Sequence, residues 1–131
     1  MLAIPEEPLE TPIKPQRTQI TSERESELRQ YLTAQAVLNN LNPDMVLYIV
    51  EKESGFNERA IGDMHLTCQK TGEPIRSLGI FQINTCVHEI ADETAFNYKE
   101  ATAWAIPHLQ TEPHIWTAYG MWLREHGLTK R

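Results

Sequence analysis

A glutamate at the end of an amphipathic stretch is the residue best suited to chemistry in this 131-residue chain. At helical spacing, Glu53 continues an apolar stripe, and Ser54-Gly55 ends the helix beside it. The apolar members of that stripe are Val46, Ile49 and Val50. A carboxyl group among apolar side chains is hard to ionise, so its pKa rises and it can hold a proton near neutral pH. The spacing therefore makes Glu53 a candidate general acid, although on this residue alone the ordinary exposure of glutamate favours the alternative, a frayed helix end that leaves Glu53 in water.

The residues before this stripe carry the signals of a helix start. Asn42 offers a capping side chain, Pro43 suits the first helical position, and Asp44 places an acid in the first turn. We therefore expect a helix from Pro43 to about Ser54. Ser54 itself is interpreted as a support for the helix end rather than a nucleophile, because no histidine stands nearby in the sequence to activate it.

Two motifs, in this order, resemble the lysozyme-like domain of soluble lytic transglycosylases and goose-type lysozymes. The first is Glu-Ser-Gly-Phe-Asn at residues 53–57, followed by Ala60 and Gly62, and the second is Ser-Leu-Gly-Ile-Phe-Gln-Ile-Asn at residues 77–84. The resemblance covers roughly residues 41–123. It implies a mainly α, lysozyme-like (α+β) fold with a small extended or hairpin segment beside a catalytic cleft.

The resemblance also implies a reaction, which is cleavage of the β-1,4 bond between N-acetylmuramic acid and N-acetylglucosamine in peptidoglycan. In lytic transglycosylases one glutamate, here Glu53, protonates the leaving oxygen. The sugar's own groups capture the cation, and the same glutamate then acts as a base to give a 1,6-anhydro end. No cofactor and no metal are implied. The residues that would line the subsites are Ser77, Gln82, Asn84 and Tyr119.

A second carboxylate would change the outcome, because most glycosidases use two. Asp63 is the nearest candidate by sequence, and Glu73 and Asp92 lie further away. Aspartates in turns usually cap their own backbone, which favours a structural role for Asp63. A lysozyme-type hydrolase therefore stays open. So do a catalytically idle glycan-binding module and a purely structural helical adaptor.

The chain departs from the family pattern in two places. Ala118-Tyr119-Gly120 stands where many members have Ala-Tyr-Asn, so one polar contact is missing. The loop from Met64 to Arg76 is longer than usual and carries a cysteine. Both differences leave the subsite preference and the reaction outcome open.

Cys68 and Cys86 bracket that loop and the second motif. Their even number, in a domain expected to work on a cell wall, favours a disulfide. Free thiols are one alternative, and a zinc site with His65 and His88 is another, although the Cys86 and His88 spacing is atypical for zinc. A disulfide fits the cell envelope or the exterior as the place of work, as in a periplasmic, phage-associated or secretion-associated protein.

Charge and hydropathy narrow the expected partners. The formal net charge is −6 and the pI is near 5.3, with no basic stripe, so nucleic acid is not expected as a partner. No apolar run has the length of a membrane-spanning helix, and the start lacks the pattern of a signal peptide. We expect a monomer that acts on peptidoglycan glycan strands. Either it is exported by a route that needs no signal peptide, or its sequence has been trimmed.

The chain divides into a tail and one domain. Residues 1–20 hold Pro5, Pro8, Pro12 and Pro15 and predict a flexible proline-rich tail, with a strand draped over the domain as the alternative. Residues 21–131 are long enough for one core.

Further helices are predicted around the two motifs. One spans about 23–39, with Ser22 as its cap in a capping box. A second spans 95–109, kinked or ended near Ile106 by Pro107. The last runs from 112–113 to about His126. Trp104 and Trp122 are expected in the core. The resemblance favours a strand-like entry running into a short helix over residues 77–84.

Overall fold

The two N-terminal helices pack against each other and form one side of the molecule. The computed structural model describes residues 21–128, so the predicted tail at 1–20 lies outside the described residues. α1 (Ser22–Leu38) packs against α2 (Pro43–Ser54), and α2 also packs against α5 (Thr117–Glu125). The remaining helical elements are α3 (Asp92–Phe96), α4 (Tyr98–Thr111) and the 3-10 turn η2 (Pro113–Ile115).

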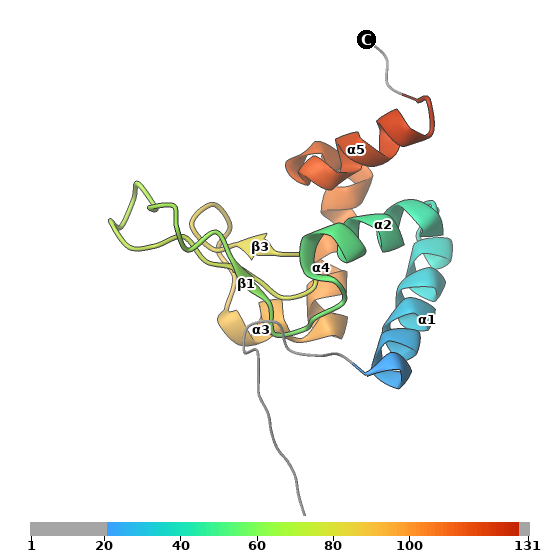
Figure 1. Cartoon of the computed structure of the whole chain (residues 1–131), viewed down its shortest axis with the longest axis horizontal. Helices are drawn as coiled ribbons and strands as arrows, with labels where there is room; N and C mark the ends of the chain where they lie inside the picture. Colours follow the sequence, from blue (N-terminus) through green and yellow to red (C-terminus); the bar gives the residue numbers. More distant parts are fainter. Residues whose placement is uncertain (1–20, 129–131) are drawn as a thin grey trace, which may run out of the picture.

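A small antiparallel sheet completes the fold. Its three strands are β1 (Ile61–Gly62), β2 (Ser77–Leu78) and β3 (Ile83–Asn84), in the order β1-β2-β3. The sheet and the long loop between β1 and β2 lie on the opposite side of the molecule from α1 (Figure 1). We call residues 61–89 the lobe. The mainly helical body with this small sheet confirms the predicted lysozyme-like α+β fold class.

One core holds the helices and the sheet together. The second motif contributes more buried apolar side chains to it than its short strands would suggest, because the turn between β2 and β3 is also buried. The fully buried side chains include Leu28, Leu32, Ile49, Val50, Leu78, Ile80, Phe81 and Ala105. Within residues 21–128 no helix is both long and apolar enough to cross a membrane.

The start of α1 differs from the prediction by one residue. Thr21, not Ser22, is the cap: the Thr21 hydroxyl accepts a hydrogen bond from the Arg24 backbone N–H at 3.0 Å. Ser22 is already the first helical residue, so its hydroxyl cannot serve that turn.

The second motif is a strand, a turn and a strand, so the predicted short helix over 77–84 is wrong. Gly79 has φ +79° and Gln82 has φ +49°, and the Gln82 N–H donates to the Gly79 carbonyl at 3.1 Å. Two left-handed residues three positions apart reverse the chain and cannot continue a right-handed helix.

The helix predicted over residues 95–109 starts later and ends later than expected. The Asn97 side chain accepts hydrogen bonds from the N–H groups of Lys99 and Glu100, both at 3.0 Å, so it caps α4 and separates it from α3. Pro107 lies inside α4 and does not end it. Pro107 has no backbone N–H, so the Ala103 carbonyl four residues earlier has no helical donor. Ala103 is exposed, so water can donate to that carbonyl instead.

The predicted last helix is interrupted. Trp116 is extended, with φ −100° and ψ 118°, between η2 and α5. Its indole N–H donates to the Phe81 carbonyl at 2.8 Å, and the side chain is buried. This contact with the lobe fixes Trp116 in a conformation that a continuous helix would not allow. Gly127, with φ +66°, follows the end of α5, which lies within one residue of the predicted end near His126.

Candidate active site

Glu53 stands on the last turn of α2, where capping interactions define both ends of the helix. The Asn42 side chain accepts a hydrogen bond from the Asp44 N–H at 2.8 Å, and Gly55 closes the helix in the left-handed conformation at φ +61°. Val46 and Val50 are buried on the same face. The helix thus presents Glu53 at the edge of the core, as the spacing predicted.

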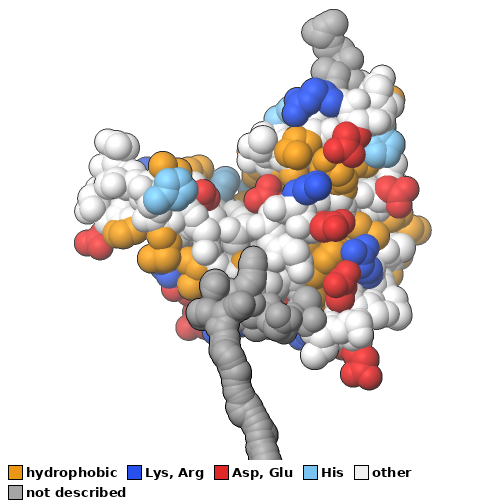
Figure 2. All heavy atoms as spheres, viewed as in Figure 1, with side chains coloured by type: hydrophobic (Ala, Val, Ile, Leu, Met, Phe, Trp, Pro, Cys, Tyr) orange, Lys and Arg blue, Asp and Glu red, His pale blue; other side chains and the backbone are white. Residues whose placement is uncertain are grey.

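Glu53 faces a cavity of about 290 Å³ between α2, the lobe and the α4–α5 region. Figure 2 shows the surface hollowed between the lobe and the helices opposite it. The cavity brings together Glu53, Asp63, Ser77, Gln82 and Asn84, which sequence reasoning had selected. The other lining residues are Ile83, His88, Trp104, Ile115, Trp116 and Thr117.

The environment of Glu53 favours its protonated form. Burial among apolar neighbours, and to a smaller extent the negative charge of Asp63, raise the pKa of Glu53 to about 7. A carboxyl group with this pKa exists in both protonation states near neutral pH. It can therefore give a proton and take one back.

Asp63 is the other carboxylate that lines this cavity. It follows β1 with φ +64°, a conformation that aspartate tolerates better than most residues, and its carboxylate accepts a hydrogen bond from the Ser77 hydroxyl at 2.6 Å. Ser77 is 1 % exposed, so this bond satisfies a buried hydroxyl. Asp63 thereby joins the loop after β1 to β2.

Gln82 supports the floor of the cavity. Its amide nitrogen donates to the carbonyls of Ala60 at 3.2 Å and Gly79 at 3.0 Å. The amide oxygen lies against Gly62, where an added Cβ would come within 2.3 Å of it. Glycine at 62 is therefore required for this position of the Gln82 side chain.

Asn84 and Tyr119 differ in their relation to the cavity. The Asn84 side-chain oxygen accepts a hydrogen bond from the Cys86 N–H at 2.8 Å, which leaves its amide nitrogen available at the cavity wall. The Tyr119 ring lies 4.8 Å from the His114 ring, edge to face, and packs partly buried against the core. The structure does not bring Tyr119 to the lining of this cavity.

Ser54 joins α2 to the lobe. Its hydroxyl oxygen lies 3.1 Å from the Val50 carbonyl oxygen and 2.9 Å from the Ile80 carbonyl oxygen, so its single hydrogen is donated to one of them or shared between both. This is the geometry of a helix-end support. It fixes the last turn of α2, and with it Glu53, relative to the turn between β2 and β3.

An aromatic wall lies in the same cavity and was not predicted. Trp104, expected in the core, is only partly buried and lines the cavity instead. Its ring stacks on His108 at 3.9 Å and meets the edge of His88 at 4.9 Å. Burial and the neighbouring His108 lower the pKa of His88, against a smaller opposing effect of Glu112. Helical periodicity places Trp104 on the inward face but does not distinguish core from cleft.

Cys68 and Cys86 form a disulfide, so neither sulfur is free to bind a metal. The bond joins the loop between β1 and β2 to the segment that follows β3. The disulfide excludes a zinc site formed by these two cysteines with His65 and His88.

Comparison with known families gives one match. The family model described as the transglycosylase SLT domain matches residues 30–107, which include Glu53, both motifs and most of α4. Comparison with curated proteins and with solved structures finds no match. Because the match spans more than half of the chain, and the fold places the motif residues around one cleft, this protein belongs to the transglycosylase SLT domain family.

Proposed function

We propose that this protein is a lytic transglycosylase that cleaves the β-1,4 bond between N-acetylmuramic acid and N-acetylglucosamine in peptidoglycan. One observation carries the proposal: the cleft holds a carboxyl group, Glu53, whose pKa of about 7 suits it to both halves of the reaction. Membership of the transglycosylase SLT domain family supports the substrate class.

In the first step Glu53 acts as the acid. The protonated carboxyl group gives its proton to the glycosidic oxygen, the bond from that oxygen to C1 of N-acetylmuramic acid breaks, and positive charge develops on the sugar ring. The N-acetylglucosamine end leaves as an alcohol. Glu53 is now a carboxylate at the edge of the core.

In the second step Glu53 acts as the base. The C6 hydroxyl of the same N-acetylmuramic acid attacks C1, and its proton passes to the Glu53 carboxylate. A 1,6-anhydro ring forms, no water is consumed, and the enzyme returns to its starting protonation state. The available Asn84 amide nitrogen and the Gln82 amide oxygen are polar groups that can orient the sugar; Tyr119 would contact it only beyond this cavity.

A lysozyme-type hydrolase is the second candidate, and one observation favours it. Asp63 lines the same cavity and lies near enough to raise the pKa of Glu53. A second carboxylate in that position can activate water or stabilise the cation. Against this role, the Asp63 carboxylate already accepts a hydrogen bond from buried Ser77.

Digestion of purified peptidoglycan, followed by mass analysis of the soluble fragments, separates the candidates. A transglycosylase releases fragments with anhydro ends, each lighter by one water than the reducing-end fragments of a hydrolase. A binding module releases nothing. Glu53→Gln is the control for contaminating activity. Reducing ends as the main product would overturn the proposal in favour of the hydrolase.

The place of action follows from the substrate. Peptidoglycan lies in the cell envelope, and the Cys68–Cys86 disulfide suits an oxidising compartment. We therefore propose that the protein works in the envelope or outside the cell, as a monomer on glycan strands.

A further inference from the structure

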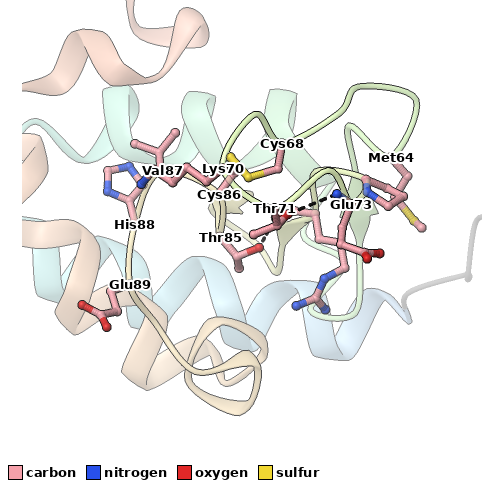
Figure 3. Close-up of a pocket in the computed structure, with 12 residues that line it drawn as sticks. Met64, Cys68, Lys70, Thr71, Glu73, Thr85, Cys86, Val87, His88 and Glu89 are labelled. Carbon is pink, nitrogen blue, oxygen red and sulfur yellow. Dashed lines mark hydrogen bonds between the residues drawn. A yellow bond between two sulfur atoms is a disulfide. The ribbon is translucent and has the colours of Figure 1, made fainter.

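A second cavity, of about 750 Å³, lies within the lobe and takes no part in the chemistry at Glu53. Residues from the loop between β1 and β2 form one wall, and residues 85–89 form the other (Figure 3). The Cys68–Cys86 bond joins these walls. The cavity therefore belongs to the longer, cysteine-bearing loop that sets this chain apart from the family pattern.

The two cavities share a wall. His88 lines both the cavity at Glu53 and the cavity in the lobe. His88 therefore lies between the two cavities, and a substituent of a ligand held at Glu53 would have to pass this one side chain to reach the lobe.

The lining of the second cavity combines apolar and charged groups. Met64 and Val87 are 53 % and 62 % exposed, which is high for apolar side chains. Lys70 has no ion-pair partner within residues 21–128, whereas Arg76 is held by two hydrogen bonds from its guanidinium to Asp92, at 2.7 and 2.9 Å. The acids that line the same cavity are Glu73 and Glu89.

This combination fits a short peptide better than a sugar. Lys70 can pair with a carboxylate, the acids can hold an amino group, and Met64 and Val87 can contact alanine methyl groups. The volume falls within the range of roughly 300–1,000 Å³ that is common for pockets that hold small ligands. A folded partner protein would instead be expected to bind a flatter surface.

We propose that the second cavity binds the peptide that N-acetylmuramic acid carries in peptidoglycan, and so makes the enzyme selective for peptide-bearing strands. The identity of this ligand rests on the proposed function. The sugar at Glu53 carries its peptide on the lactyl group, and His88 marks the passage along which that peptide reaches Lys70. The disulfide holds the two walls of the cavity at a fixed separation.

The test compares the affinities of the full chain for two soluble ligands, measured by NMR titration or calorimetry. One ligand is a disaccharide of the two peptidoglycan sugars with its peptide, and the other is the same disaccharide without it. We expect the peptide to tighten binding about tenfold, as one charge-assisted hydrogen bond and a few apolar contacts would give. Lys70→Glu and Val87→Asp should each remove most of that difference and leave binding of the peptide-free ligand unchanged.

Lys99→Glu is the matched control, because Lys99 is an exposed lysine at the start of α4 that lines neither cavity. It should preserve the preference for the peptide. Equal affinity of the parent for both ligands would overturn the inference. So would variants of Lys70 and Val87 that weaken both ligands equally, since that result points to general damage to the lobe.

The binding measurement does not depend on bond cleavage, so it separates the two proposals. Cleavage of peptidoglycan with equal binding of the two ligands would overturn this inference alone. Selective binding of the peptide without cleavage would support the peptide site and overturn the enzymatic function.

Discussion

At the scale of single residues, the proposed function depends on the proton of the Glu53 carboxyl group. Glu53→Gln keeps the size of the side chain and part of its hydrogen bonding but has no proton to give. We expect a loss of activity of about 100- to 10,000-fold, the usual value of general acid catalysis, with an unchanged far-ultraviolet circular dichroism spectrum. Release of fragments from peptidoglycan measures it. Activity within a few-fold of the parent would remove Glu53 from the mechanism.

Asp63 tests the number of carboxylates that the reaction needs. The proposed function gives Asp63 a structural role. Asp63→Asn should therefore retain at least about a tenth of the activity at its best pH, a smaller loss than the roughly 100-fold or more expected when a general acid is removed. The acid form of Glu53 is required for the first step, so the rate falls as pH rises through the pKa of Glu53. Because the charge of Asp63 raises that pKa, the variant should lose activity at a lower pH than the parent.

A pH–rate profile of both proteins measures this shift. A loss as large as that of Glu53→Gln would instead favour a hydrolase with two carboxylates. An unshifted profile would show that the charge of Asp63 does not reach Glu53.

The residue scale also shows what the sequence can reveal about the site. The place of Glu53 at the cleft was predictable because two motifs accompany its apolar helical stripe; the stripe alone does not outweigh the ordinary preference of glutamate for water. The place of Trp104 was not predictable, because a tryptophan fits such a stripe whether it ends in the core or in a cleft. Asp63 was recognised as a turn residue, but its bond to Ser77 joins positions whose proximity depends on the pairing of β1 with β2.

At the scale of elements, the turn between β2 and β3 depends on Gly79. Its φ is +79°, and an added Cβ would lie 1.9 Å from the backbone carbonyl oxygen of Ala95 in α3. Backbone cannot yield as a flexible side chain can. Gly79→Ala should therefore lower the free energy of unfolding by more than about 2 kcal/mol, measured by urea denaturation.

Gly72 provides the matched control for that substitution. It also has a positive φ, +77°, but nothing lies within 4 Å of an added Cβ. Gly72→Ala should cost only about 1 kcal/mol, the strain of the left-handed conformation itself. Equal effects at the two positions would show that conformation alone, and not contact with α3, requires glycine at 79.

The elements were predictable where local signals decide them. The cap at Asn42 and the stop at Gly55 gave α2 nearly residue by residue, since both act within one turn of the helix. The break at Trp116 was not predictable, because its cause is a hydrogen bond to Phe81, 35 residues earlier in the chain. The short strands likewise owe their register to tertiary pairing, and two-residue strands leave no period to detect.

At the scale of the whole molecule, the disulfide is the covalent constraint on the lobe. Its cysteines are separated by 18 residues, and in the chain-entropy model closure of such a loop stabilises the fold by about 3 kcal/mol. Reductant should lower the melting temperature and weaken activity while the helices persist at room temperature. Scanning calorimetry measures the melting temperature, release of fragments from peptidoglycan measures the activity, and circular dichroism follows the helices. Cys68→Ser with Cys86→Ser should reproduce all three results.

The mass of the unreduced chain provides the control for that experiment. It should be lower than the mass of the reduced chain by about two hydrogen atoms. Reaction of both cysteines with an alkylating reagent, without reductant or denaturant, would rule out the bond and weaken the proposed location outside the cytoplasm.

The raised pKa of Glu53 also has a consequence for global stability. Folding raises this pKa from its ordinary value of 4.5 to about 7, so ionised Glu53 is disfavoured in the folded state. Its cost is absent below about pH 4.5, grows between pH 4.5 and 7, and is fully present above pH 7. Glu53→Gln should therefore be more stable than the parent above pH 7, on the order of 1 to 3 kcal/mol, and equal to it below pH 4.5.

Urea denaturation across that pH range measures the difference between the two proteins. An advantage that does not change with pH would show that amide packing, and not ionisation, is responsible.

The placement of the tryptophans allows intrinsic fluorescence to measure ligand binding in the cleft. Two of its three tryptophans, Trp104 and Trp116, line the cleft, while Trp122 is buried in the core. Trp116 is 5 % exposed and as buried as Trp122, so a sugar that entered beside Glu53 would displace solvent chiefly from the partly buried Trp104. Emission from the native chain can therefore follow a glycan strand as it arrives and departs, with no dye attached, and Trp104→Phe identifies which signal belongs to the cleft.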